Sequence, residues 1–137
     1  MPADMTDLFT RAVSEIITED ELRAKLKLGR PLRLKLGMDP SRPNLHVGHA
    51  VGLRKLRAFQ DLGHTIVLIV GDWTAQIGDP SGRDESRQML TADVVCANAQ
   101  TYMDQFFLIM DKDKTEVRWQ SEWYGSFSLG DEFNLSS

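Results

Sequence analysis

Two histidines, His46 and His49, stand three residues apart in the segment LHVGH at residues 45–49. Residues at this spacing lie on one face of a helix, and the first turn of a helix attracts anions through its free amides and its dipole. Gly48 stands between them, where a helix loses roughly 1 kcal/mol relative to alanine. Because glycine has no side chain, a flat ring such as a nucleobase could approach the backbone there. A helix that begins at this segment would therefore offer a phosphate-binding site.

Two other interpretations of the histidine pair have to be weighed. Most histidine pairs on helices are exposed or packed into a core, and some pairs bind zinc. Zinc ligands on a helix more often stand four residues apart, and the only other histidine is His64. Asp39 and Ser41 stand shortly before the pair, in a segment that two prolines mark as a loop. This neighbourhood favours the phosphate site.

A second cluster, GDPSGR at residues 78–83, follows about thirty residues later, with Arg87 after it. Asp79 is held in a tight turn that suits a carboxylate directed at an ammonium group, and Arg83 and Arg87 suit a polyphosphate. The alternative is an ordinary surface turn with solvated charges. A loop of some twenty residues in a compact domain is usually functional or disordered, which favours a functional role. Ser81 has no base and carboxylate to activate it, so nucleophilic serine catalysis is not expected.

The elements that must position these clusters follow from hydrophobic periodicity and capping signals. Strands separated by helices of a dozen residues or more imply right-handed crossovers and a parallel sheet, here half of a doubly wound α/β fold. Ligands bind beyond the carboxyl ends of such strands, so both clusters should share one edge. We expect helices over residues 5–17, from Thr18 to near Gly29, from 44 or 45 to 62, from Thr91 to 109 and near 128–131, and strands over 31–38, 66–70 and 115–119.

Composition is that of a soluble globular protein. The chain has 137 residues, 42% hydrophobic and 26% charged, which fits one domain or part of a larger one. The net charge of −4 argues against nucleic-acid binding through bulk electrostatics. A local basic strip, Arg54, Lys55 and Arg57, is expected to be a solvated helix face.

The single cysteine, Cys96, excludes an internal disulfide, and its apolar neighbours predict a buried side chain. Trp73, Trp119 and Trp123 are expected to be packing residues rather than platforms for base stacking. No apolar run reaches the ~20 residues that span a bilayer, and the N-terminus lacks a signal-peptide core, so we expect a cytoplasmic protein without membrane contact.

The two clusters together, GMDPSRPNLHVGH and GDWTAQIGDPSGR, resemble the bacterial tyrosyl-tRNA synthetases. These are class I synthetases, whose HIGH signature corresponds to residues 46–49. The similarity extends from about Leu34 to Trp123 and includes QDLGH and WQSEW, whereas tryptophanyl enzymes match less well. The resemblance implies the N-terminal half of a Rossmann-like doubly wound parallel sheet, an α/β fold preceded by short helices. We expect a helical segment over residues 1–30 and a partial, ATP-binding catalytic domain over 31–137.

The resemblance also implies a two-step reaction. Tyrosine attacks the α-phosphate of ATP, which arrives with Mg²⁺, to give tyrosyl-adenylate and pyrophosphate, and the tyrosyl group then passes to the 3′ end of a tRNA. No tightly bound metal is expected. The partners implied are ATP, L-tyrosine, tRNA and, as in the family, a second copy of the chain in a homodimer.

Carried over by position, each motif residue receives a role. Ser41 and His46 would bind the γ-phosphate, and His49 would contact the ribose. Arg83 and Arg87 would follow the departing pyrophosphate. The implied catalytic set is Ser41, His46, His49, Arg83 and Arg87; the ATP set is Gly37, Asp39, Ser41, His46, Gly48 (beneath the adenine) and His49; the tyrosine set is Lys35 and Asp79.

The sequence departs from the family pattern in three respects. Lys35 stands where many members have a tyrosine that contacts the substrate hydroxyl, and Gly52 stands where some have a ribose-contacting threonine. The KMSKS-type loop, the dimer interface and the tRNA-binding domain of the family are not present, so we expect an N-terminal fragment with incomplete activity. The alternatives are a non-catalytic nucleotide- or partner-binding module and another nucleotidyltransferase of the HIGH superfamily, against which IGDPSGR argues.

Overall fold

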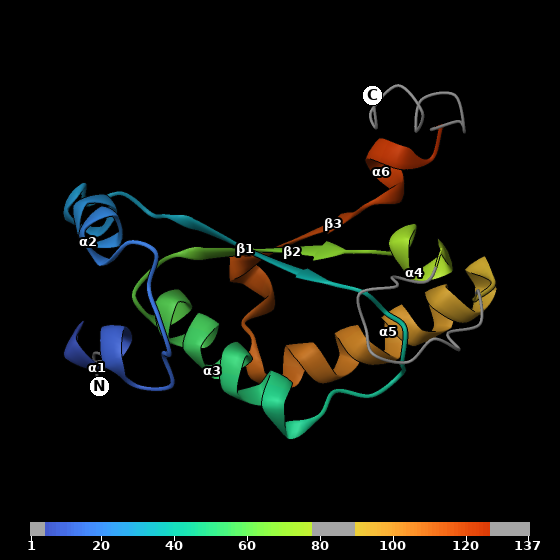
Figure 1. The fold of residues 1–137 in the computed structure, drawn as a ribbon, viewed down its shortest axis with the longest axis horizontal. Helices are drawn as coiled ribbons and strands as arrows, with labels where there is room; N and C mark the ends of the chain where they lie inside the picture. The colour runs from blue at the N-terminus through green and yellow to red at the C-terminus, as the bar shows by residue number, and fades with distance from the viewer. Residues whose placement is uncertain (1–4, 78–89, 127–137) are drawn as a thin grey trace.

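Three parallel strands form the centre of the molecule, as the alternation of strands and helices predicts. The computed structural model describes residues 5–77 and 90–126 (Figure 1). The strands β1 (Arg33–Met38), β2 (Thr65–Val70) and β3 (Thr115–Trp119) lie in the order β1-β2-β3, and both pairs are parallel. Their last residues are in register, so the three carboxyl ends meet at one edge of the sheet.

Two long helices cover one face of this sheet. Helix α3 (Val47–Asp61) connects β1 to β2, and α5 (Ala92–Ile109) precedes β3; both run along the face that points down in Figure 1. Alternate strand residues point toward them, because successive side chains of a strand point to opposite faces. β2 is the central, almost fully buried strand that its apolar sequence predicts. The buried core consists of Leu53, Ile66, Leu68, Val70, Ala99, Tyr102, Phe106 and Met110.

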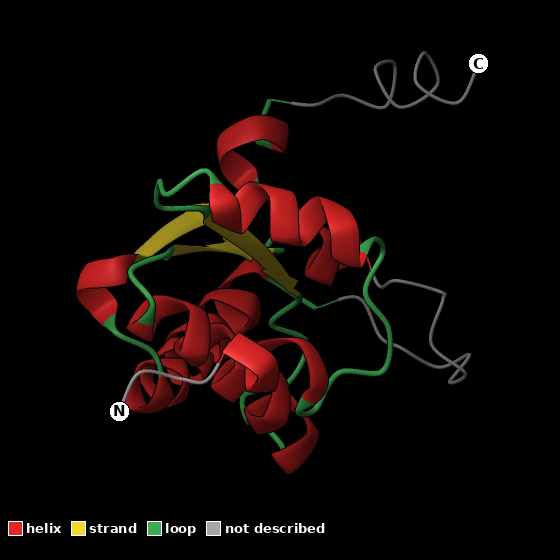
Figure 2. Cartoon of the chain, turned by 90° about the vertical axis from the view of Figure 1, so that its left-hand side faces the viewer, coloured by secondary structure: helices red, strands yellow, loops and turns green. Residues whose placement is uncertain are grey.

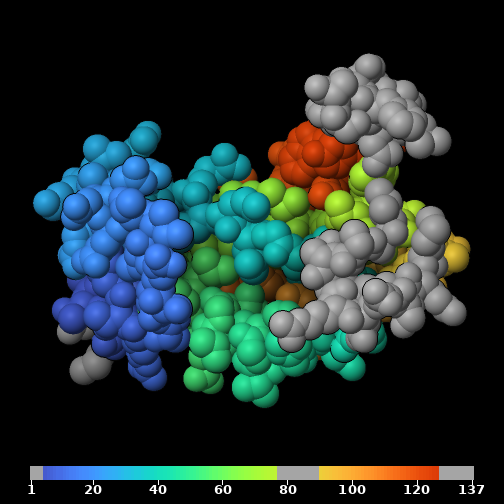
Figure 3. Space-filling model, viewed as in Figure 1, coloured from blue at the N-terminus to red at the C-terminus, as the bar shows by residue number. Residues whose placement is uncertain are grey.

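The N-terminal segment forms two short helices at one end of the molecule, opposite the short helix α6 (Ser121–Tyr124) (Figure 3). The helix expected over residues 5–17 is wrong in length, because α1 (Met5–Thr10) ends seven residues earlier. Ala12 has a positive φ of 55°, which ends the helical path, and Ile17 is 85% exposed, so no packing would hold a longer helix. Leu8 and Phe9 instead anchor α1 against Phe59 of α3.

Capping residues begin α2 and α5 where the sequence predicts, whereas α3 begins at Val47 and not at 44 or 45 as expected, because His46 is its N-cap. Thr18 accepts a hydrogen bond from Glu21 N–H and starts α2 (Glu19–Lys27), which ends before Gly29 with its positive φ of 67°. Thr91 likewise accepts from Val94 N–H at the start of α5. Figure 2 is viewed from the end that carries α1 and α2, and it shows the strands side by side as one sheet.

Two helical turns at the carboxyl edge were not predicted. The loop after β2 begins with α4 (Thr74–Ile77), and β3 runs into α6; a 3-10 turn, η1 (Lys112–Lys114), precedes β3. The helix expected near residues 128–131 lies outside the described residues. No helix within the described residues is long and apolar enough to cross a membrane.

Three surface predictions need correction. Cys96 is exposed, because α5 turns Val95 and Ala99 to the core and leaves Cys96 on its outer face. Trp119 packs against the core as predicted, whereas Trp123 is 49% exposed. The basic strip on α3 is not simply solvated: the half-buried Lys55 donates to the carbonyl oxygens of Asp7 and Leu8, and Arg57 donates to that of Ile109. Lys55 therefore holds α1 on α3.

Candidate active site

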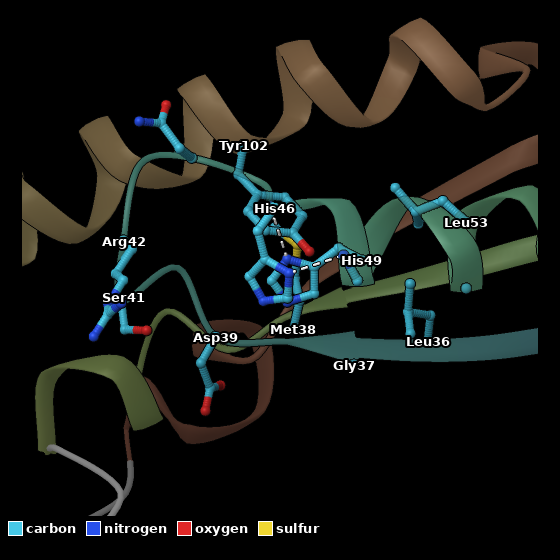
Figure 4. A pocket seen from close by; sticks show the side chains of 13 residues that line it. Leu36, Gly37, Met38, Asp39, Ser41, Arg42, His46, His49, Leu53 and Tyr102 are labelled. Carbon is cyan, nitrogen blue, oxygen red and sulfur yellow. Dashed lines mark hydrogen bonds between the residues drawn. The ribbon is translucent and has the colours of Figure 1, made fainter. Parts of the chain in front are cut away.

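A cavity of about 600 Å³ opens at the carboxyl edge of the sheet, between the end of β1, the start of α3 and the side of α5. It lies where parallel α/β sheets bind their ligands. Figure 4 shows the side chains that surround it. The loop after β1 contributes Asp39, Ser41 and Arg42, α3 contributes His46, Gly48 and His49, and α5 contributes Tyr102.

The two histidines cap α3 with their imidazole rings. His46 is the N-cap residue, and its Nδ1 accepts a hydrogen bond from Gly48 N–H at 3.1 Å. In return, His46 N–H donates to Nδ1 of His49 at 3.3 Å. The rings stack with centroids 3.7 Å apart and planes 25° apart. The pair therefore satisfies amides that a helix start leaves free, as Ser and Glu do in an ordinary capping box.

This capping uses Nδ1 of each ring and leaves Nε2 as the nitrogen that can bond to a ligand. Because Nδ1 accepts in both residues, each neutral imidazole carries its proton on Nε2, which is then a hydrogen-bond donor. The pKa of His49 is lowered, first by burial and then by the charge of His46. His49 is thus favoured in its neutral form, with Nε2–H available for an oxygen atom. Two Nε2–H donors on adjacent rings at a helix N-terminus suit phosphate and ribose oxygens.

Gly48 is required by this ring arrangement. A Cβ at this position would lie 2.9 Å from Cε1 and 3.0 Å from Nδ1 of His46, so the ring would have to shift to accommodate it. The absent side chain therefore lets the His46 ring fold back over the first turn of α3. This is a structural reason for the glycine, in addition to the nucleobase approach that the sequence suggests.

Side chains of α5 hold the loop that joins β1 to α3. Gln105 accepts from Leu45 N–H at 2.9 Å and donates to the carbonyl oxygen of Pro43 at 3.3 Å. Asn98 donates to the carbonyl oxygen of the fully buried Pro40 at 3.2 Å. The loop around Ser41 is therefore anchored from the far wall of the cavity. Tyr102, on the same helix, presents its ring to His49 with centroids 6.1 Å apart, and burial raises the pKa of its hydroxyl.

A second cavity, of about 330 Å³, lies at the same edge of the sheet. Lys35 and Ile69 line it from the strand face opposite to α3 and α5, and Trp123 lines it from α6. Gly37 and Asp39 line both cavities. The end of β1 is thus the boundary between the two.

The structure brings together most of the expected site residues but not all. Gly37, Asp39, Ser41, His46, Gly48 and His49 surround the first cavity, and Lys35 lies in the second. Asp79, Arg83 and Arg87 lie outside the described residues. Within the described residues, no three His, Cys, Asp or Glu side chains gather as a metal site.

Some cavity residues were missed by the sequence analysis. Arg42 stands next to Ser41, which was expected to bind phosphate, and a positive charge at that position could have indicated a further phosphate-binding residue. Tyr102 has only the sequence signal of an aromatic residue at helical spacing, which is equally typical of a core position. Thr74 and Gln120, which bond across the carboxyl edge, carried no signal, because they are 46 residues apart in sequence.

These features define the class: a parallel α/β protein with a cavity at the carboxyl edge of its sheet, bounded by a histidine-capped helix. The family model described as tRNA synthetases class I (W and Y) matches residues 27–136, and the chain belongs to this family. The resemblance that the HIGH and IGDPSGR segments indicate is thereby confirmed.

The curated relatives are tyrosine–tRNA ligases. The enzyme of Dehalococcoides mccartyi (strain CBDB1) is 63% identical over 130 residues, which is 95% of this chain and 33% of the relative. That of Thermotoga maritima is 53% identical over 136 residues, which is 99% of this chain and 34% of the relative. The chain thus spans about a third of the length of the curated relatives it matches.

Solved structures share the fold. A tyrosyl-tRNA synthetase from Archaeoglobus fulgidus, complexed with L-tyrosine, matches with a TM-score of 0.73 at 24% identity, over 98% of this chain and 40% of that chain. The tyrosyl-tRNA synthetase from Aeropyrum pernix matches with a TM-score of 0.69 at 23% identity, over 94% of this chain and 36% of that chain. The predicted class I synthetase fold is confirmed.

Proposed function

We propose that this chain supplies the ATP-binding part of a tyrosine-activating catalytic domain. In the reaction, a carboxylate oxygen of tyrosine attacks the α-phosphorus of ATP, the bond to the bridging oxygen breaks, and pyrophosphate leaves. The observation that carries the proposal is the stacked pair His46 and His49, which lines the first cavity at the start of α3 and keeps its Nε2 atoms as hydrogen-bond donors. Membership of the class I synthetase family supports it.

The described residues would act by positioning and by electrostatics. ATP would enter with Mg²⁺ as its substrate complex, and the γ-phosphate would meet Ser41 and Nε2 of His46. His49 would contact the ribose, and Gly48 would leave room for the adenine. Arg42, which lines the same cavity and forms no ion pair within the described residues, would add a cation near the phosphates. Donors that meet developing charge on the leaving pyrophosphate stabilise the transition state.

The second cavity is our proposed place for tyrosine. Lys35 lines it, and an ammonium group can only donate hydrogen bonds, so Lys35 would meet a substrate oxygen. Asp39 borders both cavities and would lie between the reacting groups. Asp79 is proposed to hold the tyrosine ammonium, with Arg83 and Arg87 on the pyrophosphate, on the grounds of family position alone.

The remaining partners follow from the family rather than from the described geometry. We propose tRNA as the acceptor of the tyrosyl group, a homodimer as the assembly and the cytoplasm as the location. The share of the curated relatives that the chain spans, about a third, makes each of these a proposal about the whole protein.

Calorimetric titration of the 137-residue chain with ATP and Mg²⁺ tests the first cavity. We expect His46→Ala to bind at least about tenfold more weakly, since it loses a hydrogen bond to a charged phosphate, and His49→Ala to bind several-fold more weakly, since it loses a hydrogen bond to the neutral ribose. Arg54→Ala, on the same helix but outside the cavity, is the matched control and should bind as the wild type does. Equal affinity in all four proteins would contradict the proposed role of the histidines.

Exchange of labelled pyrophosphate into ATP tests the choice of amino acid. We expect tyrosine, and neither tryptophan nor phenylalanine, to support exchange above background. If exchange requires tryptophan instead, the amino-acid substrate is tryptophan, which the same family also includes. ATP binding without exchange for any amino acid would limit the chain to nucleotide binding.

A further inference from the structure

The residues that follow the three strands form a row across the carboxyl edge of the sheet. Gly71 N–H donates to the carbonyl oxygen of Met38 at 2.7 Å, and Gln120 N–H donates to that of Val70 at 2.9 Å. The ladder of hydrogen bonds thus extends one residue beyond each strand. Asp39, Gly71 and Gln120, the first residues after β1, β2 and β3, therefore lie side by side.

One hydroxyl, that of Thr74 at the start of α4, reaches all three positions. Its Oγ1 lies 2.7 Å from Oδ1 of Asp39, 2.9 Å from Oε1 of Gln120 and 3.3 Å from the carbonyl oxygen of Gly71. A hydroxyl has a single hydrogen, and a carboxylate is the strongest acceptor of the three. The Thr74 N–H donates to Oε1 of Gln120 at 3.1 Å. The hydrogen of the hydroxyl is therefore available to Asp39, while the amide engages Gln120.

Gly71 makes this approach of Asp39 and Thr74 possible. A Cβ at Gly71 would overlap Oδ1 of Asp39 and lie 2.7 Å from Oγ1 of Thr74. Any side chain there would displace the carboxylate from the hydroxyl. The glycine and the threonine come from the segment after β2 and the glutamine from the residue after β3; Thr74 bonds to the carboxylate, and Gln120 bonds to Thr74.

That carboxylate stands at the boundary of the two cavities. Asp39 lines both, and Figure 4 shows its side chain pointing away from the imidazoles of His46 and His49. Gln120 lines the second cavity beside it. Asp39 is exposed, so the orientation of its side chain depends on hydrogen bonds rather than on close packing.

We propose that Thr74 is a positioning residue that fixes the Asp39 carboxylate between the two cavities, with Gln120 holding Thr74 and Gly71 leaving the space. Thr74 acts through Asp39 and is not itself required to contact substrate. The consequence for ligands rests on the proposed function, in which ATP and tyrosine occupy the two cavities. The orientation of Asp39 does not rest on it and can be measured separately.

The first measurement is the side-chain rotamer of Asp39 in the labelled 137-residue chain, from three-bond NMR couplings between Cγ and the backbone nitrogen and carbonyl carbon. We expect one dominant χ1 rotamer in the wild type and in Thr74→Ser, which keeps the hydroxyl. Thr74→Val keeps the shape but loses the hydroxyl, and should average the couplings over several rotamers. An unchanged single rotamer in Thr74→Val would overturn the proposal.

The control is Thr101→Val, which removes a threonine hydroxyl of α5 that donates to the carbonyl oxygen of Ala97 at 3.2 Å. It should leave the Asp39 couplings unchanged. Matching denaturation midpoints for Thr74→Val and Thr74→Ser would show that lost order at Asp39 is not lost folding. Averaged couplings in Thr101→Val as well would contradict a specific role for Thr74.

The second measurement is the affinity for L-tyrosine and for ATP with Mg²⁺. Loss of a hydrogen bond to a charged group predicts about tenfold weaker tyrosine binding in Thr74→Val, with recovery in Thr74→Ser. Unchanged affinities together with averaged couplings would overturn the functional part of the proposal. If the wild type binds neither ligand, the proposed function fails, and the NMR couplings still decide whether Thr74 positions Asp39.

Discussion

At the scale of single residues, the start of α3 combines helix capping with ligand binding in one histidine pair. The Nδ1 atoms satisfy backbone amides of the helix, and the Nε2 atoms of these two cavity-lining residues remain as hydrogen-bond donors. An ordinary capping box of Ser and Glu would satisfy the same amides, but its ionised glutamate could only accept hydrogen bonds and would offer a ligand no donor. Helix stability and the geometry of the site are therefore linked through His46 and His49.

Gly48 and Gly52 offer a matched test of this link, because both belong to α3. Gly52→Ala should raise the free energy of unfolding by roughly 0.5–1 kcal/mol, since helix propensity improves and a Cβ there meets nothing within 4 Å. Gly48→Ala should lose that gain, because its Cβ would press on the His46 ring. Urea denaturation measures both. A similar stabilisation by both alanines would show that the His46 ring does not need the space at Gly48.

At the scale of elements, side-chain amides fix how α3 and α5 sit against the strands. Gln60, on the last turn of α3, is fully buried. Its Nε2 donates to the carbonyl oxygens of Asp111 and Lys114, and its Oε1 accepts from Asp111 N–H. Gln60 thereby provides hydrogen-bond partners for backbone groups of the turn between α5 and β3. Gln105 does the same for the loop before α3.

Gln60→Ala should lower the free energy of unfolding by roughly 2–4 kcal/mol, because it leaves a cavity at a fully buried position and removes the hydrogen bonds of the side chain to Asp111, Lys114 and Thr115. Urea unfolding followed by circular dichroism measures this. Gln100→Ala, an exposed position on α5 whose side chain bonds only to Asp104 in the described residues, is the control and should change it by less than about 0.5 kcal/mol. Equal effects of the two substitutions would contradict a structural role for Gln60.

His64 makes the connection between α3 and β2 sensitive to pH. Its Nδ1 accepts from Leu32 N–H at 3.0 Å, and burial lowers its pKa below the ordinary 6.5. The unfolded chain then binds more protons than the folded chain just below pH 6.5. Stability should therefore be constant above about pH 6.5 and fall as the pH decreases toward the folded pKa.

The pH dependence is measured by urea unfolding between about pH 5 and pH 8. His64→Gln, whose side-chain oxygen can still accept from Leu32 N–H, should show a smaller loss at acid pH. His49 also has a lowered pKa and should account for part of the remaining slope. Identical pH profiles for the wild type and His64→Gln would rule out a contribution from His64.

At the scale of the whole molecule, buried apolar side chains form two clusters. The larger lies between the sheet and the helices α3 and α5, and the smaller joins Leu8 and Phe9 of α1 to Phe59 of α3. Helix α2 has no buried residue at all. The N-terminal segment therefore depends on few buried contacts, and we propose that it is a separate unit that ends near residue 30.

Hydrogen exchange under native conditions tests this division. We expect amides of β2 to exchange most slowly and those of α1 and α2 to exchange much faster, because opening a small cluster costs less free energy than unfolding the sheet. Phe9→Ala should accelerate exchange in α1 and α2 and leave β2 unchanged. Uniform protection along the chain would instead show a single cooperative unit and contradict the division.

Local sequence was sufficient for much of the architecture. The apolar run of β2, the caps Thr18 and Thr91 and the glycine after α2 placed these elements correctly, because each signal acts within a few residues. Two predictions were wrong, namely that the first helix extends to residue 17 and that Cys96 is buried. Both depended on which helix face meets the core, and hydrophobic periodicity alone did not resolve this.

The sequence by itself determined that histidines, a serine and an aspartate would gather at one edge of a parallel sheet, and which family such motifs indicate. Only the tertiary structure decided that the histidines cap their helix through Nδ1, that Lys35 belongs to a second cavity, and that Asp39 borders both. Likewise, Thr74 meets Gln120 only because the carboxyl ends of β2 and β3 are adjacent. Contacts between residues far apart in sequence depend on strand order and register, and no local pattern encodes them.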